Sequence, residues 1–148
     1  MRVLLDENIP APALVSRRVL VPHVFDHVND VGWAGVTDPD LFSRAARSGF
    51  GAIVALDRNQ LYSDAEWRAL KRSALHHVSI RQTRATQGAR GSLRLMASLL
   101  LAMPRVLDDL ETRSLGCVVE IRLLEDRDRH FIWTYREHEG RNHGSRSG

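Results

Sequence analysis

The first half of the chain consists of short apolar runs separated by stretches with helical spacing. Each run is short enough to be a strand that is buried on both faces. The runs Arg2–Asp6, His23–Val28 and Gly51–Asp57 predict three strands, and the stretches Ala11–Val19 and Pro39–Ser48 predict the two helices between them. For the second helix, Asp38 can act as the cap, Pro39 suits the first position and Gly49 ends it. This alternation predicts a parallel sheet with right-handed crossovers.

The second half continues with a predicted helix over Ala65–Ala74, a fourth strand over His77–Arg81 and a polar loop over Thr83–Gly91. Ser92 can cap a long amphipathic helix, which Pro104 either ends or kinks. The apolar face of that helix comprises Leu93, Met96, Leu99, Leu100 and Met103. We expect this face to belong to the core.

The C-terminal part predicts a β-hairpin, because Cys117–Leu124 and His130–Tyr135 flank the charged segment Glu125–Asp128. Residues 137–148 lack apolar side chains, and we expect them to be a disordered polar tail. The sequence therefore predicts one α/β domain over residues 1–136. Its mainly parallel central sheet is flanked by helices and followed by the hairpin.

Length and composition exclude several classes of protein. The chain of 148 residues suits one globular domain. Its longest apolar run, Leu95–Met103, is interrupted by Ser98, whereas a membrane-spanning helix needs about 20 residues. The short apolar start before Asp6 is too acidic for a signal peptide, so we expect a cytoplasmic protein without a membrane partner. Cys117 is the only cysteine, which excludes an internal disulfide.

Acidic residues follow the predicted strands at positions where ligands bind in parallel sheets. Asp6 and Asp57 end two strands, and Asp38 begins the helix before the second of them. Two ionised carboxylates about 5 Å apart repel by roughly 3 kcal/mol at an effective dielectric near 20, so such a cluster needs a proton, a cationic side chain or a metal ion to offset the repulsion. Oxygen ligands favour Mg²⁺ or Mn²⁺.

Each of these acids also has a simpler interpretation. Asp38 before Pro39 can be an ordinary helix cap, and Asp6 and Asp57 can be polar residues where strands reach solvent. Four other polar residues are candidates for supporting positions around the acids: Glu7, Asn8, Asp40 and Asn59.

The order and spacing of these segments resemble a known family. The segments are Leu4–Pro10, His23–Val24, Asp30–Asp40, Ala45–Gly49 and Ile53–Asp57, and together they look like the PIN-like nucleases of bacteria and archaea. The resemblance implies a PIN-like α/β sandwich and RNA cleavage that depends on Mg²⁺ or Mn²⁺. It also implies a role as the toxin of a toxin–antitoxin pair, with an antitoxin protein as partner. By position, Asp6, Asp38 and Asp57 become the catalytic, metal-binding acids.

The sequence departs from the family pattern at two positions, one within the third predicted strand and one just after it. Ala55 stands where the family commonly has a threonine, and Asn59 stands where it has a further acid. A PIN-like module that binds RNA or a protein without cleaving it is therefore an alternative. A phosphoacceptor receiver domain is a second alternative, although the only lysine, Lys71, precedes the fourth strand.

The distribution of charge favours RNA as the partner. The net charge is +3, and no acidic residue interrupts the stretch from Arg68 to Arg94, which holds seven arginines and lysines. Such a stretch can follow a phosphate backbone, although it can also be an ordinary solvated surface. The residues we expect to contact RNA are Arg58, Arg81 and Arg84. The sequence leaves open whether the chain forms a homodimer.

Overall fold

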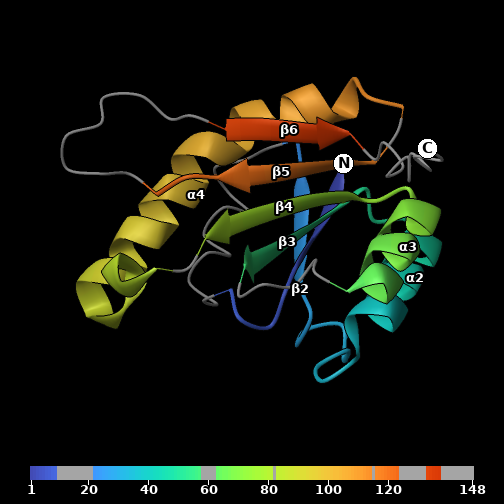
Figure 1. Cartoon of the computed structure of the whole chain (residues 1–148), viewed down its shortest axis with the longest axis horizontal. Helices are drawn as coiled ribbons and strands as arrows, with labels where there is room; N and C mark the ends of the chain where they lie inside the picture. The colour runs from blue at the N-terminus through green and yellow to red at the C-terminus, as the bar shows by residue number, and fades with distance from the viewer. Residues whose placement is uncertain (10–21, 58–62, 82, 115, 124–132, 138–148) are drawn as a thin grey trace, which may run out of the picture.

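In the computed structural model, the chain folds around one sheet (Figure 1). The structure describes all residues except 10–21, 58–62, 82, 115, 124–132 and 138–148. Its strands are β1 (Arg2–Leu5), β2 (Val24–His27), β3 (Ala52–Asp57), β4 (His76–Arg81), β5 (Cys117–Ile121) and β6 (Trp133–Glu137). Its helices are α2 (Asp38–Arg47), α3 (Asp64–Ser73), the short 3-10 helix η2 (Arg84–Thr86) and α4 (Gly88–Glu111).

The sheet has the strand order β2-β1-β3-β4-β5-β6, and its first five strands are parallel. This confirms the expected α/β class with a mainly parallel sheet. β6 pairs antiparallel with β5, but the segment that would make a hairpin of them, 124–132, lies outside the described residues. The predicted helix Ala11–Val19 and most of the predicted tail also lie outside them.

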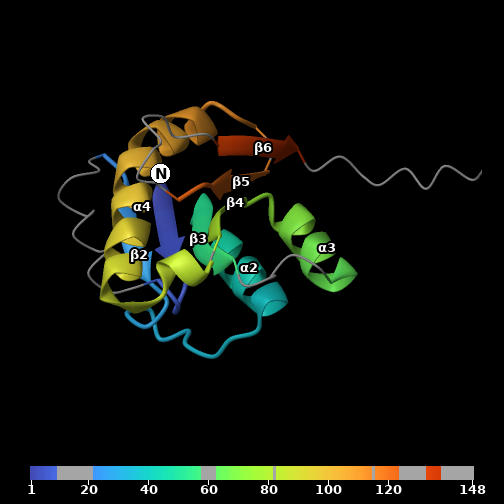
Figure 2. The same cartoon turned by 60° about the vertical axis from the view of Figure 1, so that its left-hand side comes forward.

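Helices cover both faces of the sheet, which explains why the strands are apolar on both sides. On one face, Val3, Leu5 and Val54 pack in one cluster with the buried side of α4. On the other face, Leu4 and Ile53 pack with apolar residues of α2 and α3. Figure 2 shows α4 on one side of the sheet and α2 and α3 on the other.

The position of α4 gives the last crossover a different hand from the two before it, whereas the expectation of right-handed crossovers concerned only the first three predicted strands. The connections β2–α2–β3, β3–α3–β4 and β4–α4–β5 all advance across the sheet in the same direction. Because α2 and α3 lie on one face and α4 lies on the other, the third connection has the opposite hand to the first two. The general preference for right-handed crossovers therefore cannot hold for all three. The physical reason is the apolar content of α4, which covers a face that α2 and α3 leave open.

The ends of α2 differ from the prediction by one residue. Thr37 is the N-cap and Asp38 is the first helical residue, so Asp38 is not the cap that the sequence suggested. The helix is followed by Gly49 with a positive φ of 77°, as expected for a glycine that ends a helix. The carboxylate of Asp38 is therefore not used for capping.

The long helix α4 starts earlier than predicted, and it continues past Pro104, which excludes the alternative in which Pro104 ends it. It begins at Gly88 inside the expected loop, with Gln87 rather than Ser92 as its N-cap, and it runs through Pro104 to Glu111. Pro104 is exposed, so its ring and the hydrogen bond it removes lie on the solvent side of the helix. Within the described ranges, neither α4 nor another helix has the length and apolar content needed to cross a membrane.

Candidate active site

The strand order places a topological switch point at the carboxyl ends of β1 and β3. The chain leaves β1 for β2 on one side and later returns to β3 on the other side, so these two strands form the switch point of the sheet. Ligands in open α/β sheets bind at this point. Asp6 is the first residue after β1, and its backbone N–H donates to the carbonyl of Val54 in β3 at 2.9 Å. The fold therefore holds Asp6 at the switch point.

The carboxylate of Asp6 is buried and oriented. Asp6 is only 6% exposed, and the side-chain amide of Asn8 donates to its Oδ2 at 3.1 Å. A buried carboxylate needs such a partner, because loss of hydration disfavours its charge. Asn8 therefore stabilises the carboxylate of Asp6, and it does so from one of the supporting positions that the sequence suggested.

Asp38 lies close enough to Asp6 for their charges to interact. The pKa of Asp38 is raised, first by burial and then by the negative charges of Glu66, Asp6 and Glu7. The start of α2 is therefore near enough to the end of β1 for the charges of Asp38, Asp6, Glu7 and Glu66 to interact. Their mutual repulsion disfavours ionisation of Asp38, and a bound cation would relieve it.

Glu7 and Glu66 complete this group of four carboxylates. The Oε2 atom of Glu7 accepts a hydrogen bond from the backbone N–H of Gly35 at 3.1 Å, which ties the end of β1 to the loop before α2. Glu66 lies in the first turn of α3, where Ser63 and Glu66 form a capping box. Glu66 was missed by the sequence argument. The pattern Ser-x-x-Glu after the third strand is the signal that places it at this edge.

Asp57 is the last residue of β3 and is in register with Arg81 of β4. Its backbone is therefore at the same edge of the sheet as Asp6, but its side chain is not among those described. Arg58 and Asn59 also lie outside the described residues. Asp40 is exposed, and its Oδ2 accepts from the hydroxyl of Thr37 at 3.1 Å.

The donor set of this edge fits a hard divalent cation, since it consists of carboxylate and amide oxygens. Among the side chains that the structure describes, no three His, Cys, Asp or Glu residues gather closely enough to hold a metal ion. Asp6 and Asp38 are brought together, and Asp57 is the residue from which a third ligand would come.

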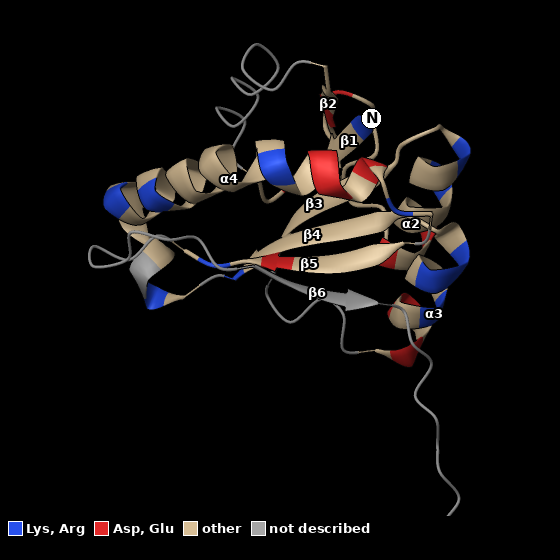
Figure 3. Cartoon of the chain, turned by 90° about the horizontal axis from the view of Figure 1, so that it is seen from above, with Lys and Arg blue, Asp and Glu red and all other residues tan. Residues whose placement is uncertain are grey.

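Arginines lie along the same edge of the sheet, at the carboxyl ends of the strands that follow β3. Arg81 ends β4, and Arg122 follows Ile121, the residue in register with Ile80. Adjacent strands lie about 4.8 Å apart, so Asp57, Arg81 and Arg122 form one row along the edge. In Figure 3, the blue of lysine and arginine lies beside the carboxyl ends of β4 and β5 and at the start of α4. Arg81, Arg84 and Arg122 are all exposed. Arg122 was missed because the sequence argument took the basic stretch to end at Arg94.

The buried histidines near the sheet have structural partners. The Nε2 atom of His27 lies 3.0 Å from the carbonyl of Ile9, and its Nδ1 accepts from the backbone N–H of Asn29 at 3.2 Å. His76 Nδ1 accepts from the backbone N–H of Cys117 at 3.1 Å. These contacts engage both ring nitrogens of His27 and Nδ1 of His76.

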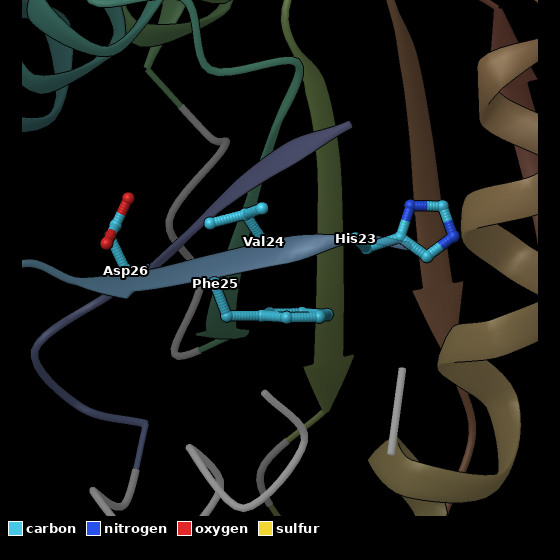
Figure 4. A pocket seen from close by; sticks show the side chains of 4 residues that line it. All are labelled: His23, Val24, Phe25 and Asp26. Carbon is cyan, nitrogen blue, oxygen red and sulfur yellow. The ribbon is translucent and has the colours of Figure 1, made fainter. Parts of the chain in front are cut away.

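A separate pocket lies along β2 and is lined by residues 23–26 (Figure 4). Its polar side chains already have charged partners. His23 lies 3.4 Å from Asp108 and 3.5 Å from Glu111, and Asp26 accepts from the guanidinium of Arg2 at 2.7 Å. This pairing makes the pocket a weaker candidate for catalysis than the acidic edge.

Comparison of the chain with models of known protein families and with curated proteins finds no match. The similarity to PIN-like nucleases therefore rests on the residues and spacing of the chain itself.

The raised pKa of Asp38 predicts that an Asp38→Asn variant is more stable than the wild type at neutral pH in a chelating buffer. A carboxyl whose pKa is higher in the folded than in the unfolded state destabilises the fold once it is ionised. The gain should therefore shrink as the pH falls, and it should vanish below the ordinary value of 3.8, where the carboxyl is protonated in both states. Thermal unfolding at a series of pH values measures it.

Asp64→Asn provides a matched control, since it removes a carboxylate from the first turn of α3. A negative charge at a helix start is normally favourable, so this variant should be slightly less stable than the wild type. If Asp38→Asn also lowers the stability at neutral pH, the carboxylate repulsion inferred at the switch point is wrong.

Proposed function

We propose that this chain is a metal-dependent endoribonuclease of the PIN-like type. The observation that carries the proposal is the buried carboxylate of Asp6 at the switch point of the sheet, which Asn8 orients and which is near enough to Asp38 for their charges to interact. Carboxylates that are buried and repel one another are typical of functional sites, and Asp6 and Asp38 would hold Mg²⁺ or Mn²⁺ together with a third ligand from Asp57. The further role as the toxin of a toxin–antitoxin pair rests on the resemblance alone.

In this proposal Asp6, Asp38 and Asp57 hold the ion. When bound, Mg²⁺ or Mn²⁺ would activate a water molecule and stabilise the charge that develops on the phosphate. Asn8 orients the carboxylate of Asp6 through its amide. Glu7 keeps the loop before α2 in place through the backbone N–H of Gly35.

The arginine row would hold the RNA backbone beside the acids. Arg81 and Arg122 occupy the ends of the two strands that follow β3 in the sheet. The phosphates bound by these arginines would belong to the part of the RNA strand that leads away from the scissile bond. Such contacts provide affinity without sequence preference.

The position of Lys71 favours the nuclease over a phosphoacceptor receiver. A receiver needs a lysine close to its phosphorylated aspartate. Lys71 is exposed in the last turn of α3, which leads into the amino end of β4. Asp57 is at the carboxyl end of β3, so the two residues lie at opposite edges of the sheet.

The direct test is incubation of the purified chain with a fluorescent, unstructured RNA in Mn²⁺, Mg²⁺ or EDTA. We expect cleavage with either metal and none with EDTA. Salt-sensitive binding without cleavage under all three conditions would favour the catalytically impaired binding module. Labelling of Asp57 by acetyl phosphate would favour the receiver.

Removal of single arginines should weaken RNA binding in a predictable way. For a single strand, each phosphate contact contributes about 0.7 to the slope of the logarithm of affinity against that of salt concentration. We expect Arg81→Ala and Arg122→Ala each to reduce this slope by about that amount, measured by fluorescence anisotropy in EDTA. Arg72→Ala is the control, because Arg72 is exposed at the opposite edge. Equal effects of all three variants would argue against a defined path of the RNA along Arg81 and Arg122.

A further inference from the structure

Charges of opposite sign lie at different strands along the carboxyl edge of the sheet. In the order β2-β1-β3-β4-β5 all five strands are parallel, so their carboxyl ends meet at one edge. Acids stand at or directly after the ends of β1 and β3, and arginines stand at or directly after the ends of β4 and β5. In sheet order these residues are Asp6 with Glu7, Asp57, Arg81 and Arg122.

The side chains of Asp6, Arg81 and Arg122 leave the sheet on the same face. Successive residues of a strand point to opposite faces, and the backbone N–H of Asp6 still pairs with β3. The residue before each of the three packs in the apolar cluster that contains α4: Leu5, Ile80 and Ile121. The three charged residues therefore point to the face that α2 and α3 cover, and α2 begins with Asp38.

The two arginines lie on one side of the acids only. β4 is the neighbour of β3 and β5 is the next strand, so Arg81 and Arg122 lie about 5 Å and about 10 Å from the end of β3 along the edge. Both residues are exposed. On the other side, the described residues that follow β1 and β2 are 6–9 and 28–37, and they include acids but no lysine or arginine.

This distribution treats the two directions of an RNA strand differently. Phosphates that pass over β4 and β5 meet two guanidinium groups, which attract them. Phosphates that pass over β1 meet the exposed carboxylate of Glu7, whose Oε2 is held by the backbone N–H of Gly35. Glu7 is not among the proposed metal ligands, so its charge would remain when the ion is bound, and like charges repel.

We propose that the carboxyl edge holds RNA on one side of the acids only, with about two phosphates over Arg81 and Arg122 and none bound by the described residues after β1 and β2. This inference rests on the proposed function, because the bound strand is taken to be the substrate. It adds a requirement on the substrate. The chain can cut beside one end of an RNA strand, but at the other end it needs about two further phosphates.

The lengths of the products test this requirement. An unstructured RNA, labelled at either end, is incubated with the chain and Mn²⁺. We expect cleavage to reach the last phosphodiester bond at one end and to stop about two phosphates short of the other. Which end is which gives the direction of the strand along the edge.

Single uncharged linkages then locate the phosphates that matter. Each RNA carries one methylphosphonate beside a 2′-O-methyl nucleotide, and the matched control carries the same nucleotide with an ordinary phosphate. On the arginine side, each of about two substitutions should slow cleavage of the nearby bond about three- to fivefold, as for an exposed charge pair. On the other side, the substitution should leave the rate unchanged.

Arginine variants connect these phosphates to the two strands. In Arg122→Ala the methylphosphonate farther from the cut should have no further effect, and in Arg81→Ala the nearer one should have none. Arg72→Ala is the control, because Arg72 is exposed at the opposite edge, and it should keep both effects. Circular dichroism would confirm that each variant is folded.

A binding measurement that needs no metal and no cleavage accompanies these assays. The isotopically labelled chain is titrated with the unmodified RNA in EDTA, and the backbone amide signals are followed by NMR. We expect shifts at Arg81, Arg122 and their neighbours, and none at residues 28–36.

The outcomes separate this inference from the nuclease proposal. Cleavage that is equally sensitive to methylphosphonates on both sides, or amide shifts at residues 28–36 as large as those at Arg81, would overturn one-sided binding and leave the nuclease proposal intact. One-sided amide shifts without cleavage in Mn²⁺ would overturn the nuclease proposal and support one-sided binding. Absence of shifts at both Arg81 and Arg122 would overturn the inference whether or not the chain cuts RNA.

Discussion

An Asp6→Asn variant is expected to lose Mn²⁺-dependent RNA cleavage by at least about a hundredfold, as when a group that stabilises transition-state charge is removed. Asp6 is the buried acid at the switch point, and its charge contributes to the raised pKa of Asp38. Cleavage rates on a fluorescent RNA measure the loss. Calorimetric titration with Mn²⁺ should show weaker metal binding in parallel.

The same variant should fold at least as well as the wild type in EDTA. Asparagine keeps an oxygen that can accept from the amide of Asn8, and it removes one of the negative charges near Asp38. Asp64→Asn serves as the control for activity, because Asp64 is exposed in the first turn of α3. Full cleavage by Asp6→Asn would exclude the proposed metal site even if the wild type proves to be a nuclease.

A Gly91→Ala variant is expected to be less stable than the wild type by about 2–3 kcal/mol, although glycine to alanine normally stabilises a helix by about 1 kcal/mol. Gly91 lies in α4 where η2 approaches most closely. A Cβ atom at this position would lie 2.1 Å from the carbonyl carbon and 2.5 Å from the carbonyl oxygen of Thr86. These are backbone atoms, so η2 would have to move.

Thr86 cannot move easily because its hydroxyl fixes η2. It donates to the carbonyl of Thr83 at 2.6 Å and accepts from the backbone N–H of Thr83 at 3.2 Å. Denaturant unfolding of Gly91→Ala measures the cost, with Ser92→Ala at the adjacent exposed helix position as the control. An increase in stability for both variants would contradict the close contact between η2 and α4.

Much of the fold could be predicted from apolar patterns, because strands covered on both faces have nearly continuous apolar runs. The strands β1 to β4 and the helices α2 and α3 agree with the prediction within one or two residues. The start of α4 does not agree with the prediction, because Gly88 and Gly91 are glycines and glycine is common in loops. Gly91 is required by contact with the Thr86 backbone, and a contact of this kind has no pattern in the sequence.

The positions of the candidate acids in the fold were predictable to a similar extent, and their role as a site stays a prediction. The strand-end rule places Asp6 and Asp57 at one edge, and the structure adds the proximity of Asp38 to Asp6. Glu66 was not predicted as a site residue, because the capping box with Ser63 is enough to explain a glutamate at this position. Arg122 escaped because its place depends on the pairing of β4 with β5, which joins residues about 40 positions apart. Local patterns do not carry such information.

The length of α4 makes the domain a single cooperative unit. One helix of 24 residues packs against side chains from β1, β3, β4 and β5. Among the described residues, α4 is the helix that covers this face of β1, β3 and β4, so a chain that stops before Gly88 would lack that cover, and exposed apolar surface favours aggregation over folding. During synthesis the nascent N-terminal half should therefore remain incompletely folded and dependent on chaperones until α4 has left the ribosome.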